Sequence, residues 1–302
     1  MKKSILVLTA LSAADSNVAE AAQILAGKLH KNLILLNCDD VLSPVLYYPA
    51  LPVMKDSYLW KEERKAKLNQ LTDHIEHRFS AIYPGQELQI QSLIMEGAVD
   101  LNVKKILKEH PVEMIVMGAS SGSSSEHFLF GSDTASIIYD SNIPVLIIPS
   151  KWIASPLRQI TFATKLMEQD IDALNYLLTL RQHLEGRLEI VHVRKYKQQE
   201  LSQFSQMIKF IEKHIGTNTP MISYHTVYGK HVIPRLNRYC NENRSEVLAL
   251  SREHHSFLFR LLKEGTVEKY LSGHKIPLLI VPQLKTKKVH AATSKTLSGI
   301  VL

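Results

Sequence analysis

The feature that most restricts the fold is an apolar segment with a proline at or near each end, which occurs twice in this 302-residue chain. The first copy runs from Asn142 to Pro149 and the second from Lys275 to Pro282. A short run of Val, Ile and Leu predicts a buried β-strand, and proline is tolerated at strand ends because its missing N–H is not needed there. The repetition of such a strand predicts a repeated domain.

Glycines mark further repeated features. Gly97 and Gly229 each follow an apolar strand, and Gly131 and Gly265 each precede a hydroxyl residue that opens a predicted helix. These pairs, like the proline-flanked strands, are separated by 132 to 134 residues. Such a constant spacing is what an old duplication leaves when structurally restrictive positions stay fixed.

The two halves differ in length near their starts. The first strands, Ile5–Thr9 and Ile160–Thr164, are 155 residues apart. The first half therefore holds roughly 23 additional residues, which we place between Val41 and Leu68. This proline-broken, aromatic segment predicts a loop that leads into a charged helix, and we expect its aromatic side chains to pack on the other half or on another subunit, with a ligand lid as the alternative.

The order of the predicted elements indicates the fold class. Each half follows the pattern β-α-β-α-β-α-β-α-β, and strands such as Met114–Met117 are apolar on both faces, as in a parallel sheet covered by helices. We therefore predict two doubly wound α/β domains with five-stranded parallel sheets, related by a pseudo-twofold axis. Their expected bounds are 1–150 and 155–283, followed by a basic tail at 284–302. In the first half the predicted strands are Ile5–Thr9, Asn32–Asn37, Glu87–Met95, Val112–Met117 and Val145–Ile148, and the predicted helices are Asn17–Leu29, Lys61–Tyr83, Leu101–Glu109 and Ser132–Tyr139.

Composition excludes several classes of protein. No apolar stretch is long enough to cross a membrane, and the two cysteines form no CxxC pattern, so we expect neither a disulfide framework nor a metal site, and a reducing, cytoplasmic location. More than half of the net charge of +7 comes from four lysines in the last twenty residues, so a role in nucleic-acid binding is not expected. The first fourteen residues follow the order of a secretory signal, but the counterpart of Ile5–Thr9 inside the chain favours a buried strand.

A glycine- and serine-rich segment carries the main chemical signal. Gly118 ends an apolar strand, a serine run follows, and Gly131 with Ser132 opens a helix. Backbone N–H groups of such a turn and of a helix N-terminus bind phosphate well. In a doubly wound sheet the loops after the first and fourth strands meet where the strand order reverses, so this position predicts a ligand site.

This arrangement resembles the signature of the universal stress protein family, in which an apolar strand precedes G-x2-G, nine residues, and G-S or G-T. Gly118, Gly131 and Ser132 match, whereas Ser121 stands where the second glycine belongs and Gly122 follows one place later. The resemblance covers both halves up to residue 282. It implies a tandem form of the family, with the fold of the adenine nucleotide α hydrolases.

The resemblance also implies a ligand, ATP or AMP, in the first half. The expected binding residues are Thr9, Ala10, Cys38, Gly97, Met117, Gly118, Ser120, Ser121, Gly122, Gly131, Ser132 and Asp133. We expect no nucleotide in the second half, where residues 248–255 replace the glycine turn. The alternative is that Gly118 and Gly131 only satisfy the backbone at a strand end and a helix start.

The first half departs from the nucleotide-binding pattern at several positions. Members that bind nucleotides resemble one another in an acidic residue after the first strand, where this chain has Ala10 and, in the second half, Lys165. Glu126 and Asp133 place negative charge near the expected phosphates, which weakens binding.

The same residues allow other interpretations. Gly118 to Gly122 match the G-x-S-x-G nucleophile elbow, with Ser120 as nucleophile, but that turn leads directly into a helix and here a serine run follows. His254 and His255 are adjacent and have no partner at helical spacing, so they do not predict a metal site. We expect no catalytic residues, with a weak ATPase or serine esterase as the enzymatic alternative and a purely interaction-based stress protein as the other.

The last strand of each half lies at a sheet edge, where an open ladder needs a partner. We expect Val145–Ile148 to pair with Leu278–Val281, giving an intramolecular pseudo-dimer that resembles the dimer contact of single-domain members. A homodimer of the whole chain is a further expectation.

Overall fold

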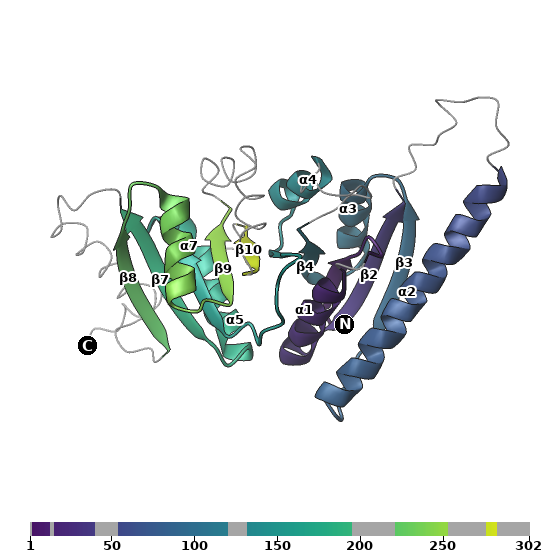
Figure 1. Cartoon of the computed structure of the whole chain (residues 1–302), viewed down its shortest axis with the longest axis horizontal. Coiled ribbons are helices and arrows are strands. Elements are labelled where there is room, and N and C mark those ends of the chain that lie inside the picture. Colours follow the sequence, from purple (N-terminus) through teal and green to yellow (C-terminus); the bar gives the residue numbers. More distant parts are fainter. Residues whose placement is uncertain are drawn as a thin grey trace, which may run out of the picture.

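The computed structural model describes residues 2–12, 15–39, 54–119, 132–194, 221–252 and 276–282. Within these residues the strands form one ten-stranded sheet in the order β3-β2-β1-β4-β5-β10-β9-β6-β7-β8 (Figure 1). The strands of the first half are β1 Ser4–Leu8, β2 Asn32–Asp39, β3 Ile90–Glu96, β4 Val112–Gly118 and β5 Val145–Ile148. Those of the second half are β6 Gln159–Ala163, β7 Arg187–Arg194, β8 Ile222–Tyr228, β9 Val247–Ser251 and β10 Leu278–Val281.

The two halves have the same strand order, because 3-2-1-4-5 in the first corresponds to 8-7-6-9-10 in the second. Neighbouring strands within each half are parallel. In both halves the order reverses beside the first strand of the half, which is the doubly wound arrangement. The predicted α/β fold class is confirmed.

The halves join through an antiparallel pair. β5 pairs with β10, with Leu146 opposite Leu279 and Val145 opposite Ile280. These are the two strands that the sequence analysis expected to meet. Pairing removes the exposed ladder that each half would otherwise present at this edge.

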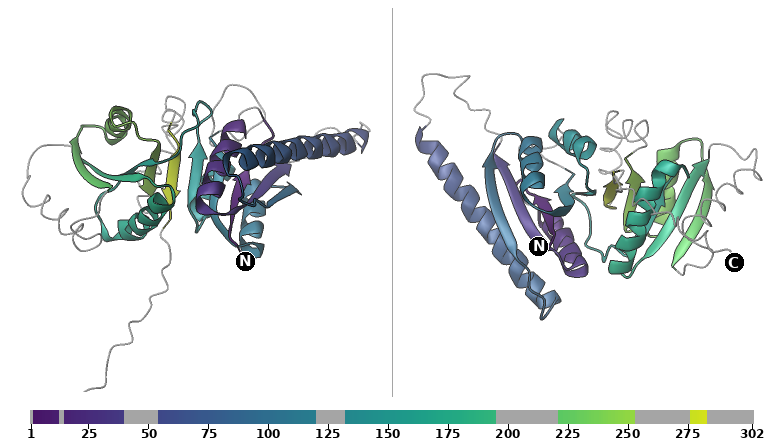
Figure 2. Two further views of the ribbon diagram at one scale, coloured as in Figure 1. Left: turned by 90° about the horizontal axis from the view of Figure 1, so that it is seen from below. Right: turned by 180° about the vertical axis from the view of Figure 1, so that it is seen from behind.

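Helices cover both faces of the sheet (Figure 2). The apolar residues of the helices belong to two separate core clusters, one on each face of the sheet. One face is covered by α1, α2 and α5, and the other by α3, α4 and α7. Their bounds are α1 Asp15–Leu29, α2 Met54–Ile82, α3 Val99–Glu109, α4 Ser132–Asp140, α5 Ile171–His183 and α7 Val232–Glu242, with a 3-10 turn, η2, at Glu168–Asp170. None of the described helices is long and apolar enough to span a membrane.

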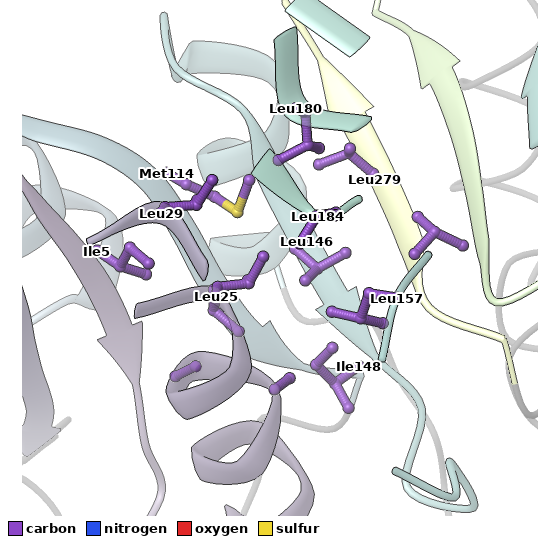
Figure 3. Packing of buried hydrophobic residues seen from close by; sticks show 14 of the residues in the cluster. Ile5, Leu25, Leu29, Met114, Leu146, Ile148, Leu157, Leu180, Leu184 and Leu279 are labelled. Atoms are coloured by element: carbon purple, nitrogen blue, oxygen red, sulfur yellow. The ribbon is translucent and has the colours of Figure 1, made fainter. Parts of the chain in front are cut away.

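Each core cluster runs through both halves without a break. On the α1 and α5 face, Leu25 and Leu29 of α1, Leu180 of α5, Leu146 of β5 and Leu279 of β10 belong to one cluster (Figure 3). All five side chains are buried. The junction between the halves is therefore packed like the interior of a single domain.

The additional segment of the first half contains the largest difference from the expected elements. α2 begins at Met54 instead of Lys61 and is 29 residues long. It lies along the outer edge of the sheet beside β3 (Figure 1). The described residues do not include Tyr47 and Tyr48, so the expected packing of those rings stays a prediction.

Candidate functional site

The turn after β1 is fixed by side-chain hydrogen bonds. The Thr9 hydroxyl donates to Asp15 Oδ2 at 3.0 Å and accepts from the Leu11 N–H at 3.1 Å. The Ser12 N–H donates to the same Asp15 oxygen at 2.7 Å, and the Asp15 N–H returns a bond to the Ser12 carbonyl at 3.0 Å. These bonds hold Leu11 at a φ of 56°, a left-handed conformation that a leucine adopts only when its surroundings impose it.

The turn after β6 repeats this arrangement bond for bond. The Thr164 hydroxyl donates to Asp170 Oδ2 at 2.5 Å and accepts from the Leu166 N–H at 2.8 Å. The Met167 N–H donates to Asp170 Oδ2 at 3.3 Å, and the Asp170 N–H donates to the Met167 carbonyl at 2.9 Å. Leu166 has a φ of 60°.

The residue that follows the threonine differs between the two turns. In both halves, however, the frame of hydrogen bonds extends to the next strand. Asn37 Nδ2 donates to the Thr9 carbonyl at 2.8 Å, and His192 Nδ1 lies 2.9 Å from the Thr164 carbonyl. Both pairs are 155 residues apart, like the strands that carry them. The two halves therefore present the same backbone at the carboxyl edge of their first two strands, with different side chains on it.

Sequence reasoning matched the threonines but missed the aspartates. A signal was present, since T-x-L followed by an aspartate six residues after the threonine occurs at Thr9 and again at Thr164. Asp15 is 7% exposed and Asp170 is fully buried. Burial raises the pKa of Asp15 above its usual 3.8, and the hydrogen bonds from Ser12 and Thr9 oppose this shift.

Several predicted site residues of the first half lie together at this edge of the sheet. Thr9 and Ala10 follow β1. Met117 belongs to the adjacent strand β4, which ends at Gly118, and it is paired with Leu8 of β1. Ala10 is exposed, whereas Thr9 is buried.

The turn after β3 is linked to this edge. Asn102 Nδ2 donates to the Gly97 carbonyl at 3.3 Å and to Cys38 Sγ at 3.5 Å. Gly97 has a φ of +94°, which explains the glycine at this position. Of the other predicted residues, Ser132 and Asp133 lie in the first turn of α4, and Ser120, Ser121, Gly122 and Gly131 lie outside the described residues.

Sequence reasoning also missed Arg64 of α2. Its Nη1 donates to Asn37 Oδ1 at 3.1 Å and to the Cys38 carbonyl at 3.3 Å. A guanidinium therefore stands at the end of β2, next to the strand that leads to Thr9. In the sequence Arg64 is one of several basic residues in a charged helix, and nothing there distinguishes it.

The second half has a cavity of about 90 Å³ at the equivalent edge, between the ends of β6, β7 and β9 and the helix α7. Its lining consists of Ala163, Thr164, Lys165, Val191, His192, Val193, Val232, Leu236 and Leu250. Through the shared frame their first-half counterparts are Leu8, Thr9, Ala10, Leu36, Asn37, Cys38, Val99, Val103 and Met117. Four of these counterparts belong to the predicted site of the first half.

Among the described residues no group of three or more His, Cys, Asp and Glu side chains is arranged to hold a metal ion. His254 and His255 lie outside those residues, so the expectation about them stays untested. Cys38 and Cys240 are not joined by a disulfide bond.

The fold defines a class: this is a doubly wound α/β protein, and proteins of this class bind ligands where the strand order reverses. Comparison with known proteins names the family. Residues 1–149 match the model of the Universal stress protein family. A universal stress protein of Methanocaldococcus jannaschii is 28% identical over 86 residues, which are 28% of this chain and 53% of that protein, so the chain spans about half the length of this curated relative. Residues 1–149 belong to the universal stress protein family.

Solved structures show how far the fold extends. A universal stress protein from Archaeoglobus fulgidus superposes with a TM-score of 0.67 at 16% identity, covering 93% of this chain and 98% of that one. A functionally unknown protein from Pseudomonas aeruginosa gives a TM-score of 0.62 at 14% identity, covering 94% and 93%. At such identities the match establishes the fold alone, and it includes both halves.

Proposed function

We propose that the first half binds an adenine nucleotide, ATP or AMP, without catalysing a reaction on it. The observation that carries the proposal is the position of Arg64, whose guanidinium reaches Asn37 and Cys38 at the carboxyl edge of β2. Doubly wound sheets bind ligands at this edge, and arginine is well suited to phosphate. Family membership of residues 1–149 supports the same ligand class.

The proposed site is a weak one. Ala10 has no side-chain acceptor for the ribose or base, and Asn37 already uses its amide on the Thr9 carbonyl and its oxygen on Arg64. The remaining affinity comes from backbone N–H groups, from the guanidinium and from the N-terminus of α4. We therefore expect dissociation constants of about 0.1–1 mM.

Isothermal titration with ATP and with AMP tests the proposal. Arg64→Ala should weaken nucleotide binding about tenfold, since a charge-assisted contact is lost. Arg78→Ala is the matched control, because Arg78 lies on the same helix but forms an ion pair with Glu20 of α1 at 2.7 Å. It should leave nucleotide affinity unchanged.

Absence of heat and of a thermal shift at millimolar nucleotide would refute the proposal. The interaction-based alternative, in which neither half holds a nucleotide, would then stand. Equal weakening by both arginine variants would show that charge on α2 matters without a specific site.

Two broader properties belong to the same proposal. The pairing of β5 with β10 joins the two halves of one chain. It takes the place of the contact between two copies in single-domain members, so the second half acts as the dimer partner of the first. A cytoplasmic location is supported by the two free thiols.

A further inference from the structure

The cavity of the second half combines an apolar floor with basic groups at its mouth. Ala163, Val191, Leu236 and Leu250 are buried and line the floor. Lys165 is exposed and His192 is half-buried at the rim. Ligand sites typically have this form, a mostly apolar hollow with a few polar groups that fix orientation.

The first half serves as an internal reference for this cavity. The turns after β1 and β6 share their hydrogen bonds and their left-handed leucine, so differences between the halves at these positions lie in the side chains. Leu8 occupies the place of Ala163 and is itself 8% exposed. The first half therefore carries a larger side chain than the second at this position of the frame.

The rim differs in the same systematic way. Ala10 corresponds to Lys165, and Asn37 corresponds to His192. The His192 ring is oriented by its Nδ1, which lies 2.9 Å from the Thr164 carbonyl. A carbonyl only accepts, so Nδ1 carries the hydrogen and Nε2 is the acceptor nitrogen of this tautomer.

The acidic groups near the cavity are engaged elsewhere. Asp170 accepts the Thr164 hydroxyl beneath the turn. Glu189 lies on the same face of β7 as Val191, two residues before it. Its Oε2 accepts a hydrogen bond from the Tyr239 hydroxyl at 3.2 Å. None of the residues that line the cavity is acidic, so Lys165 gives its rim a positive charge.

We propose that this cavity binds a small carboxylic acid with a compact apolar body, which the floor receives while Lys165 binds the carboxylate. The volume of about 90 Å³ is several times the ~10–15 Å³ that one water needs but far below the roughly 300–1,000 Å³ of sites for drug-sized ligands. A nucleotide is too large for it, and a benzoate-sized acid with part of its ring enclosed is of the right order. The proposal concerns another half and another ligand class than the nucleotide site, and does not depend on it.

Binding of 4-fluorobenzoate to the full chain, followed by ¹⁹F NMR, tests the proposal, with 4-fluorobenzyl alcohol as the uncharged probe of similar shape. The acid should bind with a dissociation constant of about 1 mM, and the alcohol at least about tenfold more weakly. Equal binding of the two probes would overturn the assignment of an acid. No binding of the acid at about 10 mM would overturn the site itself.

Variants that carry the first-half residues locate the binding and are compatible with the fold, since the same frame already holds those residues once. Ala163→Leu should weaken the acid at least about tenfold by filling the floor. Lys165→Ala should weaken it about three- to tenfold. Circular dichroism and thermal unfolding confirm that each variant is folded.

The matched control is Ala10→Lys, which adds the same cation to the turn of the first half, where Leu8 stands at the position of Ala163. It should leave the affinity for the acid at the wild-type value. An affinity that is unaffected by Ala163→Leu, or one that rises with Ala10→Lys, would place the binding elsewhere and refute the proposal.

Discussion

Arg252 crosses from the second half to the first, and its replacement by alanine tests how strongly the halves are coupled. It follows β9, and its Nη1 donates to the Tyr139 carbonyl at 2.9 Å and to the Ser141 carbonyl. Both carbonyls lie at the C-terminal end of α4, where helix carbonyls lack partners within the helix. The corresponding residue of the first half is Ala119, which cannot make the reciprocal contact. Only the second half therefore contributes an arginine side chain to this contact between the halves.

The magnitude follows from the kind of contact. A hydrogen bond to a charged group contributes about 1.5–3 kcal/mol when buried, but Arg252 is half-buried and one nitrogen serves both carbonyls. Arg252→Ala should therefore lower the free energy of unfolding by about 2 kcal/mol. Arg238→Ala is the matched control, because its side chain is 76% exposed and pairs with Glu242 one helical turn away. Such an exposed pair contributes only about 0.3–0.5 kcal/mol.

Urea unfolding measures the global effect, and amide hydrogen exchange shows where it arises. The Ser141 N–H donates to the Ile137 carbonyl and the Ile143 N–H donates to the Ser141 hydroxyl, so these two amides report on the end of α4. Both should exchange faster in Arg252→Ala and at the wild-type rate in Arg238→Ala. If the two variants lose the same stability, or if exchange at Ser141 and Ile143 is unchanged, Arg252 does not brace α4 and the reasoning fails.

Two more predictions concern the repeated turns. Thr9→Val and Thr164→Val each remove a hydroxyl that bonds to a buried aspartate and to a leucine N–H, so each should cost about 2 kcal/mol in urea unfolding, and clearly unequal losses would show that the turns are not equivalent. Because burial raises the pKa of Asp15, the folded chain holds this proton more tightly than the unfolded chain, and this group adds stability as pH falls through the folded pKa towards 3.8. As the pH falls over that range, the free energy of unfolding of the wild type should therefore rise relative to that of Asp15→Asn. A difference between the two proteins that stays constant with pH would contradict the raised pKa.

The strands could be predicted from the sequence because burial on both faces leaves a direct record. Met114 to Met117 of β4 are apolar at every position except the edges, and the last strands are additionally marked by prolines. The strand order follows from the doubly wound class once those strands are recognised. The bounds of α2 were less accessible, because a helix start without a clear cap leaves little signal.

The candidate site could be predicted only in part. The positions of Thr9, Cys38 and Met117 follow from the ends of strands, which the sequence indicates. The role of Arg64 does not, since its contacts with β2 depend on the path of α2 across the additional segment. Asp15 and Asp170 were missed because their bonds join residues on the two sides of a turn, where neither the helix period nor the strand period applies.

The cavity of the second half was out of reach for a different reason. Leu8 and Ala163 are both apolar residues at the end of a first strand, and a pattern of apolar positions treats them as the same. What separates them is side-chain volume within a fixed frame, and that frame is visible only once the hydrogen bonds of both turns are known. The bonds of Thr9 and Thr164 hold the backbone constant, so the neighbouring side chains are free to differ without loss of the fold. In a duplicated chain of this kind the backbone is the same in both halves. The side chains that differ between the halves on this backbone therefore indicate a difference in ligand most directly.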